Sequence, residues 1–347
     1  MDRFVRLSND ERHRYFVQTA ERMRLSPQII EKDFWVCWML RELFALPDIR
    51  SMLIFKGGTS LSKAYRLIER FSEDVDVSMD RDGLGFGDDA SDPEAIISGK
   101  ERRRRIERLK EACKRKIADE LRPTMIKTIE AALGDVQGWS LTVDEDDLDR
   151  QTLLYAYPSS LPETTGAYIR PAVKIELGAR SDHWPSDQVR ITPYVAERFP
   201  AAFETTGFVV KVLAAERTFW EKATLLHAEY HRPPEKEIPL RLSRHYYDTS
   251  RLILSGIGEK ITGHPGLLQR VVEHKKVFFP SGWAHYDEAI RGNIRLTPHR
   301  GRIRQLEEDY DKMREMFFAE RPAFAEILRI LEEWETHFNQ GQFDERG

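Results

Sequence analysis

The chain has 347 residues, of which 41% are hydrophobic and 32% are charged, so it contains enough apolar material for a folded core. This length predicts two domains, or one large domain with a helical extension. Lys and Arg number 54 and Asp and Glu number 58, which gives a net charge of −4. The near balance excludes a nucleic-acid binder that is basic throughout, but it leaves room for a local basic surface.

Cysteine content and apolar runs favour a cytoplasmic protein. The two cysteines, Cys37 and Cys113, do not make a disulfide framework, and no pairing between them is predicted. The first residues lack the apolar core of a signal peptide. The longest strongly apolar run, residues 34–40, is far shorter than the ~20 residues that a membrane helix needs.

In the first eighty residues helices are followed by short strands. The first fifty residues are predicted to be helical, with Ser26 as the cap of a helix that Pro47 ends. A buried strand is expected at residues 52–55, then a glycine turn and a helix over residues 61–68. Residues 74–79 alternate polar and apolar side chains, which predicts a half-buried strand.

The rest of the chain changes from mixed to helical. Residues 81–97 are expected to form a loop, and residues 144–149 an acidic turn. A basic amphipathic helix is predicted at residues 100–116, with ten basic and three acidic side chains, and a further strand at residues 173–177. Later helices are predicted at residues 213–230, 242–254, 306–318 and 324–338. The predicted fold class is α+β, with one domain at residues 1–205 and a helical domain at residues 206–347.

Two aspartates share one face of the predicted strand at residues 74–79. Side chains at positions i and i+2 of a strand point to the same face, so Asp74 and Asp76 lie side by side. Neighbouring carboxylates repel each other unless a cation lies between them, and an oxygen-only ligand set favours Mg²⁺. Glu176, on the other alternating strand, is a candidate third ligand. The alternative is a solvated strand face, because an Asp-x-Asp motif is weak by itself.

A glycine turn precedes these aspartates by one helix. Gly57 and Gly58 lie between the predicted strand and helix, and Thr59 or Ser60 could cap that helix. Backbone N–H groups at such a position bind phosphate, and glycine allows close approach. Lys63 is predicted in the first turn of the helix and could add positive charge. For Gly-Gly alone an ordinary turn is the alternative, and the spacing of a Walker loop is absent. Together with the aspartates, the turn predicts a triphosphate site and its metal.

Residues 55–63 followed by residues 70–77 form one compound motif, and further characteristic segments lie at residues 30–36, 216–222, 244–248 and 309–318. Together these segments resemble the AbiEii-type nucleotidyltransferases, which belong to the polymerase-beta-like superfamily; the compound motif is similar to the first motif of this family. The AbiEii-type family includes abortive-infection toxins and the mycobacterial MenT toxins. The gap from Gly58 to Asp74 is longer than in the wider superfamily and fits the AbiEii branch better than the minimal antitoxin branch.

The resemblance implies a nucleotidyltransferase fold, with a small mixed β-sheet flanked by helices and an all-helical C-terminal part. In the implied reaction an acceptor hydroxyl attacks the α-phosphate of an NTP and pyrophosphate leaves. The implied residues are Gly57, Gly58 and Ser60 for the nucleotide phosphates, Asp74 and Asp76 for Mg²⁺, Glu176 as a third acid, Lys222 for the triphosphate and Asp248 as support for the active site.

Two of these residues have structural alternatives. Lys222 could be a helix-surface lysine that pairs with Thr218 or a nearby acid. Asp248 could form an ion pair within its own helix, with Arg244 or Arg251. Neither alternative is excluded by the sequence.

Three classes of function follow. The first is an AbiEii-like nucleotidyltransferase, the toxin of a toxin–antitoxin pair, with the tRNA 3′ end as acceptor and a winged-helix antitoxin as possible partner. The second keeps the enzyme but changes the acceptor to a protein or a small molecule. The third is a non-catalytic module that binds RNA or a partner. The basic helix at residues 100–116 could contact RNA phosphates or could be a solvated charged face.

Overall fold

A computed structural model describes residues 1–72, 74–162, 170–318 and 320–342; Glu73, within the first matching motif, lies outside them. The chain forms two compact units. The sheet unit consists of Met1–Ala64 and Phe71–Val212, and the helical unit consists of Tyr65–Arg70 and Leu213–Gly347. The division predicted at residues 205 and 206 stays a prediction.

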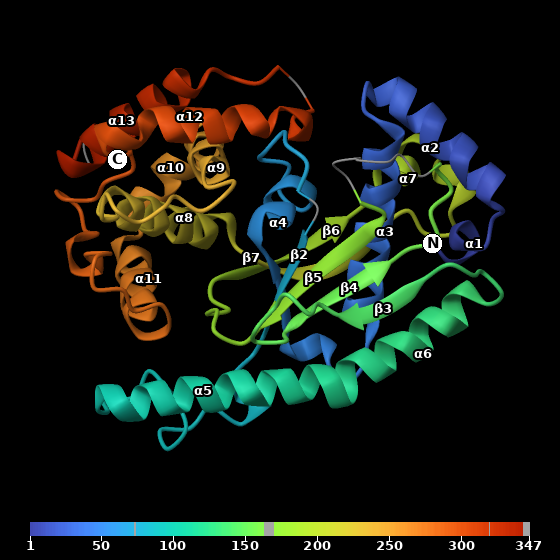
Figure 1. Cartoon of the computed structure of the whole chain (residues 1–347), viewed down its shortest axis with the longest axis horizontal. Helices are drawn as coiled ribbons and strands as arrows, with labels where there is room; N and C mark the ends of the chain where they lie inside the picture. The colour runs from blue at the N-terminus through green and yellow to red at the C-terminus, as the bar shows by residue number, and fades with distance from the viewer. Residues whose placement is uncertain (73, 163–169, 319, 343–347) are drawn as a thin grey trace. The chain divides into compact units, whose positions relative to one another are not determined.

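Within the described residues, the sheet unit contains a mixed sheet of seven strands in the order β3-β4-β5-β2-β1-β7-β6 (Figure 1). Its central strand β2 pairs antiparallel with β1 and parallel with β5, and β1 pairs parallel with β7. The predicted mixed sheet is therefore confirmed. The strands are β1 (Leu53–Lys56), β2 (Asp74–Met79), β3 (Ser140–Val143), β4 (Thr152–Ala156), β5 (Ala172–Gly178), β6 (Ser186–Ile191) and β7 (Phe208–Leu213).

Helices accompany this sheet from the N-terminus onward. Ser26 caps α3 as predicted, because its side chain accepts a hydrogen bond of 3.3 Å from the N–H of Ile29. A π-helical turn, Ile117–Leu121, joins α5 to α6. The helices of this unit are α1 (Asp2–Val5), α2 (Asn9–Met23), α3 (Pro27–Ala45), α4 (Gly57–Lys63), α5 (Gly99–Lys116), α6 (Arg122–Leu133) and α7 (Tyr194–Arg198).

One face of the sheet is buried by α3, which crosses it in Figure 1. Trp35 and Trp38 of α3 contact the ring of Tyr155 on β4, with centroid distances of 6.0 and 5.7 Å. Tyr155 pairs with Val173 on β5, so both side chains lie on this apolar face. Because strand side chains alternate, the polar residues of β2 and β5 point to the opposite face.

The helical unit is built around α8 and α9. No helix in the described part of the chain is both long and apolar enough to cross a membrane. The helices are α8 (Ala215–Tyr230), α9 (Ser243–Leu254), α10 (Ile257–Lys260), α11 (Pro265–Phe278), α12 (Ile303–Lys312) and α13 (Phe324–Asn339).

Two helix predictions are wrong at their C-terminal ends. The helix expected over residues 306–318 ends at Lys312, because Phe317 instead forms an isolated antiparallel bridge with Arg70. The helix expected over residues 61–68 starts earlier and ends at Lys63, and the following segment belongs to the helical unit. Apolar residues that recur at helical spacing in these two segments thus contact distant parts of the chain and do not extend the helices.

Candidate active site

The predicted aspartate pair lies on the half-exposed face of β2. Asp74 and Asp76 are partly exposed, whereas Val75 and Val77 are buried. Asp76 pairs with Lys56 of β1. The alternation of residues 74–79 therefore places both carboxylates on the face opposite α3.

The glycine turn lies directly against Asp76. Gly57 has a φ of +78°, a left-handed conformation that residues with side chains rarely adopt. A Cβ atom built on Gly57 would lie 1.9 Å from Oδ2 and 2.6 Å from Cγ of Asp76. Gly58 follows in the first turn of α4 and is half-buried. The turn and the aspartate strand thus meet within the sheet unit.

Thr59 and Ser60 are buried, and their hydroxyl groups hold the turn together. Oγ1 of Thr59 donates a short hydrogen bond to the carbonyl oxygen of Asp74, which links α4 to the start of β2. Oγ of Ser60 donates to the carbonyl oxygen of Gly57 at 2.8 Å. Neither residue caps α4, contrary to the prediction, because Lys56 occupies the N-cap position.

Lys63 does not lie where it was predicted. It belongs to the last turn of α4 rather than the first. Its Nζ lies 2.6 Å from Oδ1 of Asp33 and 3.6 Å from the ring centroid of Tyr194. Burial opposes the charge, but Asp33 raises the pKa of Lys63 above its usual value. The ammonium group therefore anchors α4 to α3 through Asp33.

Glu176 lies beside Asp76 in the register of β2 and β5, but its Oε1 forms an ion pair of 2.8 Å with Nζ of Lys174. Among the residues that the structure describes, no three His, Cys, Asp or Glu side chains are placed to hold a metal ion. One or two carboxylates are enough for Mg²⁺ at a nucleotide site, since water and phosphate complete its shell. Glu176 as a third ligand stays a prediction.

The helical unit brings together the other two predicted residues. Nζ of Lys222 on α8 donates to Oδ2 of the fully buried Asp248 on α9, at 2.8 Å. Arg70 binds the same carboxylate through Nε to Oδ1 at 2.7 Å and through Nη2 to Oδ2 at 2.8 Å. Nδ1 of His245 lies 3.4 Å from Nζ of Lys222. Lys222 therefore pairs with Asp248 rather than Thr218, and Asp248 pairs with side chains from two other segments.

Two cations offset the burial of this single carboxylate. Burial by itself raises the pKa of Asp248, but Arg70 and Lys222 hold that pKa well below its usual value. Burial, reinforced by Arg70, lowers the pKa of Lys222 despite the attraction of Asp248. Burial also lowers the pKa of His245 far enough that its imidazole is neutral and can accept from Lys222. The cluster therefore has an excess of positive charge, two cations against one carboxylate.

Arg70 and His245 are the members of this cluster to which sequence reasoning assigned no role. Tyr65–Arg70 follows α4 along the chain, yet it belongs to the helical unit. The carbonyl oxygen of Glu69 accepts a hydrogen bond of 3.0 Å from the N–H of Phe318, which fixes the segment there. Arg70 and Asp248 are 178 residues apart, so no local pattern could reveal their pairing. The one available signal was the place of Arg70 in the first matching motif.

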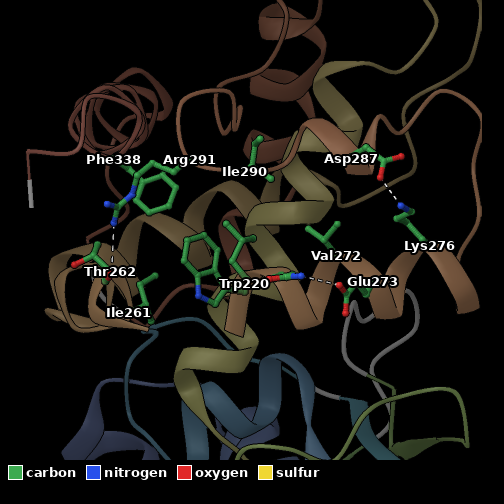
Figure 2. A pocket seen from close by; sticks show the side chains of 12 residues that line it. Trp220, Ile261, Thr262, Val272, Glu273, Lys276, Asp287, Ile290, Arg291 and Phe338 are labelled. Atoms are coloured by element: carbon green, nitrogen blue, oxygen red, sulfur yellow. Dashed lines mark hydrogen bonds and ion pairs between the residues drawn. The ribbon is translucent and has the colours of Figure 1, made fainter. Parts of the chain in front are cut away.

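A cavity of about 400 Å³ lies elsewhere in the helical unit (Figure 2). Trp220 of α8, Val272 of α11 and Arg291 are among the residues that line it. Neither Lys222 nor Asp248 lines this cavity. It is therefore separate from the buried ion cluster, which consists of Arg70, Lys222, His245 and Asp248.

The chain is similar in sequence to a known protein family and also matches solved structures. A family model described as the nucleotidyl transferase AbiEii toxin of type IV toxin–antitoxin systems matches residues 38–335. Among solved structures, MenT4, a nucleotidyltransferase toxin from Mycobacterium tuberculosis H37Rv, is 16% identical with a TM-score of 0.41, over 94% of this chain and 99% of that chain. JHP933 from Helicobacter pylori is 14% identical with a TM-score of 0.33, over 92% and 99%. No curated protein matches the chain.

Proposed function

Because the chain belongs to the AbiEii family of nucleotidyltransferase toxins of type IV toxin–antitoxin systems, we propose that it transfers a nucleoside monophosphate from an NTP to an RNA hydroxyl. The acceptor that we propose is the 3′ end of tRNA, in the cytoplasm. Membership of the family implies an NTP substrate and an antitoxin partner. The contact between Gly57 and the carboxylate of Asp76 is the observation that carries the proposal, because it joins a phosphate turn to a pair of acids.

Mg²⁺ fits the residues at this contact. Asp74 and Asp76 present hard oxygen donors on one half-exposed strand face. Because Gly57 has no side chain, its backbone lies directly against the Asp76 carboxylate, so phosphate oxygens bound at the turn would lie near that carboxylate and its metal. When bound, Mg²⁺ would polarise the phosphoryl oxygens. The backbone of Gly57 and Gly58 would orient the triphosphate for attack by the acceptor hydroxyl.

A cation is needed for the pyrophosphate that leaves. In our proposal, Lys222 neutralises charge that develops on the pyrophosphate. Asp248 and Arg70 act as positioning residues, since the carboxylate that accepts from Nζ of Lys222 is itself held by two hydrogen bonds from Arg70. Little covalent chemistry then falls to the protein, and positioning and charge do most of the catalysis.

A transfer assay tests the proposal. The protein is incubated with Mg²⁺, total tRNA and each of the four NTPs in turn, labelled at the α-phosphate. We expect label on RNA with at least one NTP, and no label with Asp76→Asn. The matched control is Asp119→Asn, which changes an exposed aspartate of the π-helical turn and should label RNA like the wild type. Label on protein instead of RNA would show that RNA is not the acceptor. No label on either molecule would overturn the proposal.

A further inference from the structure

Helix α5 carries a dense set of basic side chains, ten against three acidic ones, on a chain whose net charge is −4. Some of them have structural roles in the protein. Arg105 donates through Nη1 to the carbonyl oxygens of Asp89 and Asp92, both at 2.8 Å, and so holds the preceding loop. Lys110 forms an ion pair of 2.7 Å with Asp149. Arg105 and Lys110 lie on the inner side of α5, which packs against the rest of the protein. Other basic residues lie on its outer side, which faces solvent.

The outer side of α5 has cations that the protein itself does not neutralise. Its exposed basic residues are Lys100, Arg103, Arg104, Arg108 and Arg115. Arg104, with a side chain 73% exposed, has a long contact of 3.6 Å with Glu101, which is worth little in water. Within the described ranges, Lys100, Arg103 and Arg115 have no ion-pair partner. Cζ of Arg108 lies 6.0 Å from the ring centroid of Phe86.

Two acids lie on the same side and offset part of this charge. Glu107 and Glu111 form ion pairs with Lys110 and Lys114, at 3.4 and 3.5 Å. These exposed contacts are as weak in water as that of Arg104, so both acids count against the positive charge of the face. The face still carries five basic residues against these two acids, so an approaching molecule meets an excess of positive charge.

The spacing of the exposed cations places four of them in a row along the helix. Lys100, Arg104, Arg108 and Arg115 are separated by four, four and seven residues, so they lie on one face of the helix. At ~1.5 Å of rise per residue the row is roughly 22 Å long. Three of the four are arginines, whose planar donors bind phosphate oxygens in pairs. A row of this length and charge suits a polymer of phosphates rather than a single anion.

We infer that this face of α5 (Lys100, Arg103, Arg104, Arg108 and Arg115) binds the phosphate backbone of the RNA acceptor. The inference rests on the proposed function, because the RNA is the acceptor of the transfer reaction. Phosphate contacts of this kind position an RNA and carry no sequence information. The helix would therefore hold RNA of many sequences, and the choice of the modified end would be made elsewhere in the enzyme.

Binding of fluorescent total tRNA, measured by anisotropy without NTP, tests the inference. The variant is the triple substitution Arg104→Gln, Arg108→Gln and Arg115→Gln. We expect it to bind at least tenfold more weakly at low salt, and to lose about two to three from the slope of log affinity against log salt concentration. The matched control changes three exposed arginines of the helical unit, Arg300→Gln, Arg304→Gln and Arg329→Gln, and should bind tRNA like the wild type.

A second variant predicts the opposite sign. Glu107→Gln with Glu111→Gln removes the two acids of this face, so we expect tRNA binding at least threefold tighter than that of the wild type. Wild-type affinity in both the arginine and the glutamate variants would overturn the inference, and so would an equal loss in the control triple variant. Label transfer to RNA by the wild type, measured in parallel, is independent of this result. Tight binding through α5 without any label transfer would overturn the proposed function and the acceptor role of the RNA, and would leave α5 as an RNA-binding face.

Discussion

Gly57 combines two constraints at one position, a left-handed backbone and contact with a carboxylate. Its φ is +78°, and a Cβ atom would lie 2.9 Å even from Cβ of Asp76. Rotation of the Asp76 side chain alone therefore does not make enough room. Any larger residue at position 57 must move the acid that we propose as a metal ligand.

We expect Gly57→Ala to lower both stability and activity. The left-handed conformation costs an L residue roughly 1–2 kcal/mol, so the free energy of unfolding should fall by about this amount. Displacement of the Asp76 carboxylate should lower kcat/KM for label transfer by more than tenfold. Urea unfolding and the transfer assay measure the two effects separately.

Gly266→Ala is the control for this substitution. Gly266 has no atom within 4 Å of a built Cβ and no left-handed φ, so alanine should be tolerated there with unchanged activity. Wild-type kcat/KM in Gly57→Ala would show that Asp76 does not need its observed position.

The pKa of Lys222 predicts a pH dependence. Burial lowers this pKa from the usual 10.5, so the ammonium group loses its proton at a lower pH than an exposed lysine does. If the cation is needed for transfer, kcat/KM falls on the alkaline side, with a midpoint below pH 10.5. Arginine stays protonated throughout this range, so Lys222→Arg should move the alkaline fall to higher pH. Pyrophosphate release measured across the alkaline range tests this, and an unshifted alkaline fall in the variant would assign it to another group.

At the scale of elements, local patterns revealed the strands that have one buried face. In β2 and β5 polar and apolar residues alternate, and both strands were predicted from that alternation. Four strands were missed. The edge strands β3 and β6 are mostly exposed and lack an apolar run, whereas β4 and β7 were missed although both contain apolar runs. A strand that buries little side-chain surface leaves little pattern in its sequence.

In the candidate site, too, the sequence indicated relations between residues that are close along the chain and did not indicate pairings between distant ones. Gly57, Asp74 and Asp76 lie within twenty residues, and their strand, turn and strand pattern predicted a common site. The pairing of Lys222 with Asp248 was not evident from helical spacing, which favoured partners within one helix. Lys63 was misplaced because a helix of seven residues is too short to show which side faces the core.

The buried ion cluster should behave as one energetic unit. Arg70→Met leaves the buried carboxylate of Asp248 with Lys222 as its remaining cation, which we expect to cost roughly 3–5 kcal/mol of unfolding free energy. The double variant Arg70→Met with Asp248→Asn should be less unstable than the sum of the two single variants, by about 0.5–3 kcal/mol. Urea unfolding of the four proteins in the cycle measures this coupling.

Arg304→Met supplies the comparison for the cycle. The side chain of Arg304 is 92% exposed and pairs with Glu308 one helical turn away, so its loss should change stability by less than about 1 kcal/mol. Additive effects of Arg70→Met and Asp248→Asn would contradict a cluster that acts as a unit.

At the scale of the whole molecule, the path of the chain ties the two units together. The chain leaves the sheet unit after Ala64, contributes Tyr65–Arg70 to the helical unit, and returns to the sheet unit at Phe71. A boundary drawn from composition at residue 205 cannot detect such an excursion, since six residues carry no compositional signal. The helical unit therefore depends on a segment that precedes the rest of it by more than 140 residues.

This dependence predicts how isolated fragments will behave. The fragment of residues 206–347 lacks Arg70, so the carboxylate of Asp248 would keep one cation in a buried site, and we expect no cooperative unfolding transition. Joining residues 64–72 to its N-terminus through a flexible Gly/Ser linker should restore a cooperative transition in urea, followed by circular dichroism. The same fusion with Arg70→Met is the matched control and should not restore it. If the fragment without the segment unfolds with the same midpoint as the fusion, Tyr65–Arg70 contributes no stability to the helical unit, and the excursion is only a connection between α4 and β2.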